Sequence, residues 1–306
     1  MLTRRLFLTA GACALASPAL AQVVATLGSG EETLTVLSDG SFELPLSMLA
    51  RDIPQAELSA EAKQTGPTRS VLNVTCLKRG KDVILFDCGS GANFLKGSGK
   101  LGESLKAAGI EPDAVTHVLF THLHPDHFWG ALDEFDSPLF ANARWLVAAP
   151  EIGFWTDPKV YAGLPEDRHA FAAGAQRIAK ELGDKLERLE PGREWLPGIE
   201  AVATPGHTPG HVSFAIEAAG GPVMVLGDAL THPLISFARP DWRPASDHDA
   251  DLAVATRRKL LDRLAQDKTQ IIGYHLPGAV GRVERQARPT ASSPPDEPVR
   301  ACSAGP

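Results

Sequence analysis

The sequence predicts a mixed α/β (α+β) fold, and three observations support this prediction. Short apolar runs typical of strands alternate with segments of helical periodicity along most of the chain. Histidine or aspartate follows several of these strands directly, at four separate places. The 306 residues, of which 43% are hydrophobic, suffice for a sizeable core in one large or two medium domains. Since open α/β sheets bind ligands at strand ends, we expect the functional site there.

The first half of the chain is expected to supply strands, a flap and two helical segments. In order, these are a strand at 32–37, a turn at Asp39-Gly40, a flap at 42–49, a weak helix at 54–66, a hairpin of 71–77 and 82–86, and a helix at 102–108. The turn at Gly80-Lys81 sets a hairpin register that pairs Cys76 near Leu85 rather than with Cys88. Both cysteines are therefore expected to be buried thiols.

The second half is expected to alternate strands with one long helical insertion and one late helix. In order, these are a strand at 142–148, mostly helical sequence at 150–190, strands at 199–203, 212–216 and 223–226, a helix at 250–265, and a last strand at 270–273. In the late helix, Leu252, Leu260 and Leu264 have a spacing that favours a core-facing position.

Both ends of the chain are expected to lie outside the folded domain, which leaves residues 22–285. Residues 1–21 resemble an export signal, with Arg4 and Arg5 before an apolar run that is too short to span a bilayer. The two arginines also resemble a twin-arginine motif, which predicts a periplasmic protein. Residues 286–306 are rich in Pro, Ala, Ser and Arg, and we expect a disordered tail.

The charge balance narrows the class of partner. The chain has 37 acidic against 30 basic residues. It has no basic cluster for nucleic acid and no polybasic segment for an anionic membrane, so no stable membrane insertion is expected. Small neutral or cationic molecules are the expected partners, and a homodimer is compatible with the sequence.

The densest group of reactive side chains follows the short apolar strand at residues 118–120. Four potential metal ligands lie within six positions there: His122, His124, Asp126 and His127. Pro125 prevents a simple extension of the strand, so these ligands are expected on the loop at its carboxyl end. Packing them together without a cation would cost several kcal/mol of desolvation and repulsion. A metal site is therefore favoured over a structural cluster.

Three further candidate ligands follow other predicted strands: His207, Asp228 and His275. The order of all these motifs resembles the metallo-β-lactamase fold superfamily of metal-dependent hydrolases. It comprises H-x-H-x-D-H at residues 122–127, P-G-H-T-x-G-H at residues 205–211, Gly227-Asp228 and the late His275. The resemblance implies a four-layer αββα sandwich, with two mixed sheets face to face, helices outside, and the site along one edge.

The resemblance also implies two metal ions per chain. His122, His124 and His207 would bind one ion, Asp126, His127 and His275 the other, and Asp228 would bridge them. Imidazole nitrogen and carboxylate oxygen suit Zn²⁺ first, and Mn, Fe or Co would also be accepted.

The implied reaction is hydrolysis of an ester-like bond by a hydroxide that bridges the two metals. Asp126 or Asp228 would receive or relay the proton. Within the superfamily, Asp228 is typical of lactonases, methyl parathion hydrolase-like enzymes and glyoxalase II-like enzymes, and the β-lactamases proper lack it. Asn142-Ala143 and Phe154-Trp155 look most like the branch of quorum-quenching lactonases and methyl parathion hydrolases. A lactone is the first substrate expected, and an organophosphate triester the second.

Two other functions stay open. A thioesterase of the glyoxalase II type or a β-lactamase would keep the same site with a different pocket. A non-catalytic metal-binding protein would keep the ligands for stability alone, without the open coordination that a catalytic water requires.

Several side chains that are not candidate ligands are also expected near the site or far from it. His211 is expected to orient the His207 loop. Trp155 and Phe42 are favoured as apolar cover for the site. His169 and His248 are expected at the surface.

Overall fold

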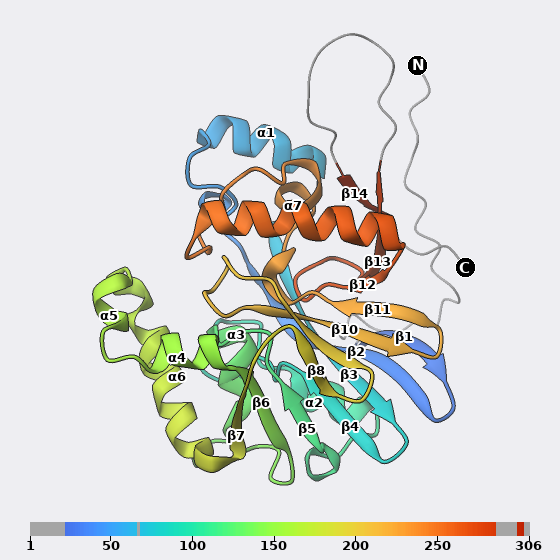
Figure 1. Ribbon diagram of the computed structural model, residues 1–306. Helices are drawn as coiled ribbons and strands as arrows, with labels where there is room; N and C mark the ends of the chain where they lie inside the picture. Colours follow the sequence, from blue (N-terminus) through green and yellow to red (C-terminus); the bar gives the residue numbers. More distant parts are fainter. Residues whose placement is uncertain (1–21, 66–67, 286–298, 303–306) are drawn as a thin grey trace.

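The computed structural model describes residues 22–65, 68–285 and 299–302, and these residues form two seven-stranded sheets packed face to face. Helices cover both outer surfaces (Figure 1), with α7 (Ala250–Asp267) against one sheet and α2 (Leu101–Ala107) and α6 (His169–Leu182) against the other. The predicted four-layer αββα sandwich is therefore confirmed. The predicted export signal at residues 1–21 lies outside the described residues.

The strands of the first sheet follow one another in space in the same order as in the sequence. They are β1 (Val23–Ser29), β2 (Glu32–Glu43), β3 (Arg69–Arg79), β4 (Asp82–Phe86), β5 (His117–Leu119), β6 (Arg144–Ala148) and β7 (Leu186–Leu189). Neighbours from β1 to β4 are antiparallel, and neighbours from β4 to β7 are parallel. The β3–β4 hairpin pairs Cys76 with Leu85, and Cys76 and Cys88 are buried free thiols, as predicted.

The predicted turn at Asp39-Gly40 is wrong, because β2 continues through it with a shift in register between Ser38 and Gly40. Gly40 has a positive φ of 101°, and a Cβ there would lie 2.1 Å from the carbonyl oxygen of Gly97. The Asp-Gly pair therefore makes a bulge that lets a later loop approach the strand. The strand at the edge beside β2 is β1, which the sequence pattern did not predict.

The second sheet has the spatial order β14-β13-β12-β11-β10-β9-β8. Its strands are β8 (Arg193–Leu196), β9 (Ile199–Ala203), β10 (Val212–Ala218), β11 (Gly221–Val225), β12 (Gln270–Ile272), β13 (Val280–Arg285) and β14 (Val299–Cys302). Only β11 and β12 pair in parallel. The β14 strand corrects the prediction of a disordered tail at these four residues, because their backbone continues the ladder of β13. Residues 286–298 and 303–306 lie outside the described part of the chain.

The remaining helices are α1 (Gln55–Thr65), α3 (Pro125–Phe128), α4 (Ala149–Thr156) and α5 (Val160–Gly163). Short 3₁₀ and π turns are η1 (Leu46–Met48), η2 (Pro112–Ala114), η3 (Trp129–Ala131), η4 (Glu166–Arg168), η5 (Gly183–Lys185), η6 (Gly227–Ala229) and η7 (Leu234–Ala238). The predicted helical insertion thus ends in a strand, β7. In α7, Leu260 and Leu264 are buried as predicted, whereas Leu252 is exposed because it faces away from the sheet.

The core between the two sheets is made by the inward side chains of both. Phe86 of β4 and Phe214 of β10 are fully buried, with ring centroids 5.2 Å apart. Burial of each such side chain contributes roughly 1.5–3 kcal/mol. This packing fixes the two sheets against each other, and the strand ends that carry the candidate ligands lie together as a result. In the described part of the chain, no helix is long and apolar enough to cross a membrane.

Candidate metal centre

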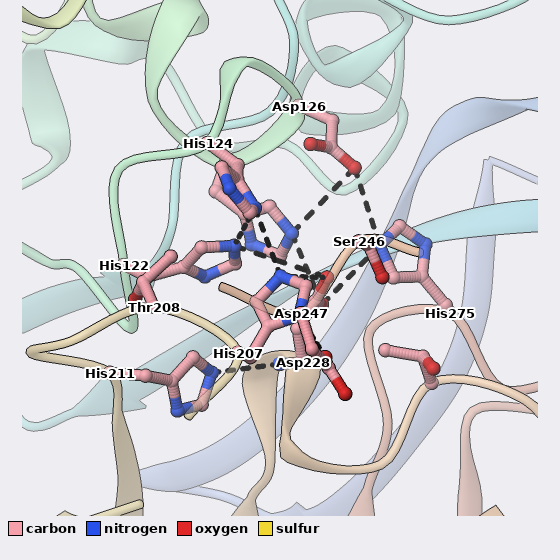
Figure 2. A network of polar contacts seen from close by, with 12 residues as sticks. His122, His124, Asp126, His207, Thr208, His211, Asp228, Ser246, Asp247 and His275 are labelled. Atoms are coloured by element: carbon pink, nitrogen blue, oxygen red, sulfur yellow. Dashed lines mark hydrogen bonds and ion pairs between the residues drawn. The ribbon is translucent and has the colours of Figure 1, made fainter. Parts of the chain in front are cut away.

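The structure brings all seven predicted ligands into one buried cluster (Figure 2). They form two groups whose ligand atoms lie within 4.8 Å of one another: His122, His124, His207 and Asp228 in the first group, and Asp126, His127 and His275 in the second. Each of the seven residues is at most 8% exposed. No other set of three or more metal-ligating side chains meets this criterion in residues 22–65, 68–285 and 299–302.

The first motif is folded partly as loop and partly as helix. His122 follows β5 on a loop, and His124 is the residue that precedes α3. Asp126 and His127 lie within α3, which corrects the expectation that the whole motif is a loop. Pro125 occupies the first helical position, where its fixed φ favours a helix and its missing N–H costs nothing.

The other three ligands come from the second sheet. His207 lies between β9 and β10, Asp228 in η6 after β11, and His275 after β12. Gly227 has a positive φ of 53°, and a Cβ there would lie 2.8 Å from His211 Nε2. The glycine therefore allows the backbone that carries Asp228 to pass close to the histidine loops.

Asp228 lies between the two groups. Its Oδ2 is 3.2 Å from His207 Nε2 in the first group. Its Oδ1 is 3.3 Å from both His127 Nε2 and His275 Nε2 in the second group. One carboxylate thus presents one oxygen to each group, which is the arrangement that a bridging ligand requires.

In three of the five candidate histidines, the ring nitrogen that points away from the centre has a carboxylate or backbone carbonyl oxygen as its partner. His127 Nδ1 donates to Asp87 Oδ2 over 2.8 Å. His207 Nδ1 donates to Asp247 Oδ1 over 3.0 Å, and His275 Nδ1 donates to the Val71 carbonyl over 2.9 Å. These bonds hold the hydrogen on Nδ1 and leave Nε2 free to bind a cation.

His122 is held in the same way through a relay. The Thr121 hydroxyl donates to Asp87 Oδ2 over 2.8 Å, and its oxygen lies 3.1 Å from His122 Nδ1. Since the hydroxyl hydrogen is used for Asp87, the oxygen accepts from His122. Asp87 therefore orients one histidine of each group, directly or through Thr121.

The donor set fits a divalent cation in each group. His127 Nε2 and Asp228 Oδ1 are buried and have no hydrogen-bond partner among the described residues. In the first group, His124 Nδ1 lies 3.0 Å from His122 Nε2 and 2.9 Å from His207 Nε2. Three lone-pair nitrogens cannot converge in this way without a proton or a cation among them. Imidazole and carboxylate ligands suit zinc and related ions.

Without metal, protons on some of the histidines compensate part of the negative charge of the carboxylates. Burial alone would lower the pKa of His207 and His275. Asp228 together with Asp247 at His207, and with Asp126 at His275, outweighs burial and raises these pKa values to about 9 and about 10. Asp228 and Asp126 likewise raise the pKa of His127 above its ordinary value despite burial. By contrast, burial and neighbouring histidines lower the pKa of His122 and His124. In the metal-free protein, the raised pKa values of His127, His207 and His275 favour their imidazolium forms beside the surrounding carboxylates.

We expect metal binding near pH 7 to release about three protons per chain, because His127, His207 and His275 must lose theirs to bind a cation. Affinity should therefore weaken as the pH falls. In the metal-free protein, the stability from these raised pKa values is complete below about 6.5 and is lost as the pH rises through 9 to 10. Calorimetric titration with Zn²⁺ in two buffers of different ionisation enthalpy measures the release. Binding without proton uptake by the buffer would contradict this charge assignment.

Glu151 of α4 is a buried carboxylate that the sequence prediction missed. It accepts hydrogen bonds from Leu123 N–H (3.0 Å) and Trp155 Nε1–H (2.7 Å) through one oxygen. It accepts from the Thr208 hydroxyl (2.7 Å) and Gly210 N–H (3.0 Å) through the other. Burial raises the pKa of Glu151. The side chain therefore ties the loop of the first motif to the loop of the second.

The other sequence predictions around the centre have mixed outcomes. His211 contacts the His207 loop as expected, because its Nδ1 lies 2.8 Å from the Thr204 hydroxyl, and its Nε2 also accepts from Asp228 N–H over 2.9 Å. His248 is half-buried where a surface position was expected, and its ring lies 5.6 Å from that of His124. Trp155 does not cover the site, because it is fully buried beneath His124. Phe42 is half-buried and meets His275 edge to face at 6.2 Å, as favoured.

Asp87, Glu151 and Asp247 are the polar partners that sequence reasoning missed. For Asp87 a signal was available, because it follows the predicted strand at 82–86 as Asp228 follows another. For Glu151 and Asp247 we find no local signal, because each acts on a residue at least 28 positions away.

Comparison with known proteins places this geometry in context. A family model described as the metallo-beta-lactamase superfamily matches residues 68–275. An N-acyl homoserine lactonase from Bacillus sp is 26% identical over 175 residues, which cover 56% of this chain and 60% of that relative. The chain thus matches less than two thirds of the length of this curated relative.

Two solved structures are similar over most of the chain. One is the hydrolase AbOPH of the beta lactamase superfamily, with a TM-score of 0.80, 27% identity, and coverage of 92% of this chain and 97% of that one. The other is AidC, a dizinc quorum-quenching lactonase in complex with a product, with a TM-score of 0.80, 26% identity and the same coverage.

Proposed function

Because the chain belongs to the metallo-beta-lactamase superfamily, we propose that it is a dinuclear metal-dependent hydrolase of ester-like bonds. The observation that carries the proposal is the position of Asp228, whose two oxygens face different groups of candidate ligands. The similarity to an N-acyl homoserine lactonase and to a dizinc lactonase supports it. Zinc is the first metal proposed, and Mn, Fe or Co would fit the same donors.

In this reaction, Asp126 and Asp228 would have separate roles beside the two ions. Two divalent ions, when bound, would lower the pKa of a water and polarise the bond to be cleaved. Asp228 would hold the two groups together and offset part of the repulsion between the cations. In the metal-free protein, burial would raise the pKa of Asp126 and Asp228, but the neighbouring histidines outweigh it and lower both pKa values. The bound cations would replace this positive charge, so both carboxylates would be ionised in the loaded enzyme. Either carboxylate can therefore take up the proton that hydrolysis releases.

A lactone with an apolar chain is the substrate class that we favour. Half-buried aromatic rings lie beside the polar centre: Phe42 is 6.2 Å from His275, and Phe171 is 5.7 Å from His124. Phe94 meets Phe42 edge to face at 5.7 Å. An apolar surface next to polar metal ligands suits a ligand that has an apolar body and one reactive ester.

The test is metal analysis together with hydrolysis rates before and after chelation. The substrates would be an acyl-homoserine lactone, a phosphotriester, a glutathione thioester and a β-lactam. We expect about two ions per chain, and a fall in lactone hydrolysis of more than about 10³-fold on chelation, which added metal reverses, because the ions supply several kcal/mol of transition-state stabilisation.

Each other outcome has a defined meaning. A faster rate on the thioester or the β-lactam would reassign the substrate class. Bound metal without turnover on any ester would indicate a metal-binding protein. Turnover that is indifferent to chelation would refute the metal-dependent mechanism.

A further inference from the structure

A short segment between η7 and α7 contacts two candidate ligands of the same group. This support segment comprises Pro244, Ala245, Ser246, Asp247, His248 and Asp249, and it has no helix or strand of its own. It runs beside the loop of His207, since His248 N–H donates to the His207 carbonyl over 3.1 Å and Asp249 N–H to the Gly206 carbonyl over 3.0 Å. Asp247 lies next to His207 and accepts from its Nδ1 (Figure 2).

The next residue, His248, faces a second ligand. Its Nε2 lies 3.4 Å from His124 Nε2. His124 turns Nδ1 toward the other ligands, so binding of a cation through Nδ1 requires the hydrogen on Nε2, from which it can be donated to His248. The His248 ring is held edge to face by Phe154 at 5.3 Å and Trp155 at 5.5 Å.

Three arginines from three separate parts of the chain hold the support segment. Arg51, which follows η1, donates to the carbonyls of Pro244 (3.2 Å), Ala245 (3.3 Å) and Asp247 (2.8 Å). Arg168 of η4 donates to the carbonyls of Ala245 and Ser246. Arg257 of α7 is buried and pairs with Asp247 Oδ2 over 3.2 Å. Arg51 and Arg168 thus make five contacts with the backbone carbonyls of a segment whose own residues form no helix or strand, and these contacts satisfy its carbonyl oxygens.

We propose that the support segment is a single positioning element for one of the two metal ions. Asp247 sets the tautomer of His207, and His248 sets the tautomer of His124. Arg51 and Arg168 hold the segment in place. The inference rests on the proposed function, because it needs a metal in the first group. The segment has no such role in the second group. Among the described residues, Asp126, His127 and His275 have their hydrogen bonds and ion pairs with other parts of the chain.

The test compares the two dissociation constants for Zn²⁺, measured by competition with a fluorescent chelator. His248→Phe keeps the ring packing but removes the acceptor, and Asp247→Asn removes the charge at His207. We expect each variant to raise the dissociation constant of one ion by roughly 10- to 100-fold, which is the usual effect when a ligating histidine loses its partner. The dissociation constant of the other ion should change by no more than about twofold. His248→Gln, which can still accept through its side-chain oxygen, should restore most of the affinity.

A second comparison tests the arginines. The double variant Arg51→Ala, Arg168→Ala should weaken the same ion. Arg79→Ala is the matched control, because Arg79 also donates to two backbone carbonyls, of Pro197 and Glu217, but lies at the end of β3 remote from the ligands. In an Asp126→Ala background, only the ion of the first group should remain bound. His248→Phe should raise its dissociation constant by the same factor as in the parent protein.

The outcomes separate the two proposals. Unchanged constants in His248→Phe and Asp247→Asn, or an equal loss for both ions, would overturn the positioning role while the proposed function stands. A parent protein that binds no ion in the same titration would overturn the proposed function as well.

Discussion

Replacing Asp228 with asparagine is expected to lower hydrolysis by roughly 10³-fold and to remove at least one of the two ions. Asparagine keeps the shape of the side chain but has one oxygen and no charge, whereas both carboxylate oxygens of Asp228 face ligand groups. Loss of a bridging charge forfeits several kcal/mol of transition-state stabilisation, and each 1.36 kcal/mol is a factor of ten in rate. Metal content and kcat/KM on the best substrate would be measured on the same preparation.

Asp126→Asn is the matched comparison, because Asp126 contacts only the second group. It should weaken one ion and leave the other bound, with a smaller loss of activity. If Asp228→Asn kept two tightly bound ions and its full rate, the bridging role and the mechanism built on it would be wrong. A thermal unfolding curve distinguishes either result from simple loss of the fold.

The sequence could predict the candidate ligands because each lies in a short motif beside a predicted strand. His122 to His127 are close together in the sequence, and the other three ligands each follow a short apolar strand. The same reasoning predicted the strands of the hairpin and most strands near the centre, because these are short, apolar and bounded by turn residues. The division of the ligands between two metal ions came from the resemblance to the family.

Two of the misses share a physical origin, since both depend on contacts between distant residues. Asp39-Gly40 has the composition of a turn, yet Gly40 packs against Gly97 and β2 continues. His248 has the surroundings of a surface residue in the sequence, yet the arginines that fold its segment onto His124 lie as far away as position 51. Local composition cannot report such tertiary constraints.

Replacing Asp87 is expected to weaken the binding of both metal ions, although Asp87 is not a ligand. Its carboxylate is fully buried, accepts from His127, and accepts from Thr121, which in turn holds His122. Asp87→Asn is the variant of choice, because Asp87 has a positive φ of 65°, a conformation that asparagine also tolerates. We expect both dissociation constants to rise by roughly 10- to 100-fold. Breaking a buried charge pair should also destabilise the metal-free protein by about 3–5 kcal/mol, measurable by urea unfolding.

Two companion variants separate orientation of the ligands from stability of the fold. Thr121→Val removes the relay to His122 alone, so only the ion of the first group should weaken. Asp39→Asn affects another buried carboxylate, which accepts from Ser90 and Leu101 and has no contact with a candidate ligand in the bonds described here. The Asp39→Asn variant should destabilise the fold and leave the dissociation constants of both metal ions nearly unchanged. If Asp39→Asn weakened the ions as much as Asp87→Asn, metal affinity would follow global stability, and the orienting role of Asp87 would have to be abandoned.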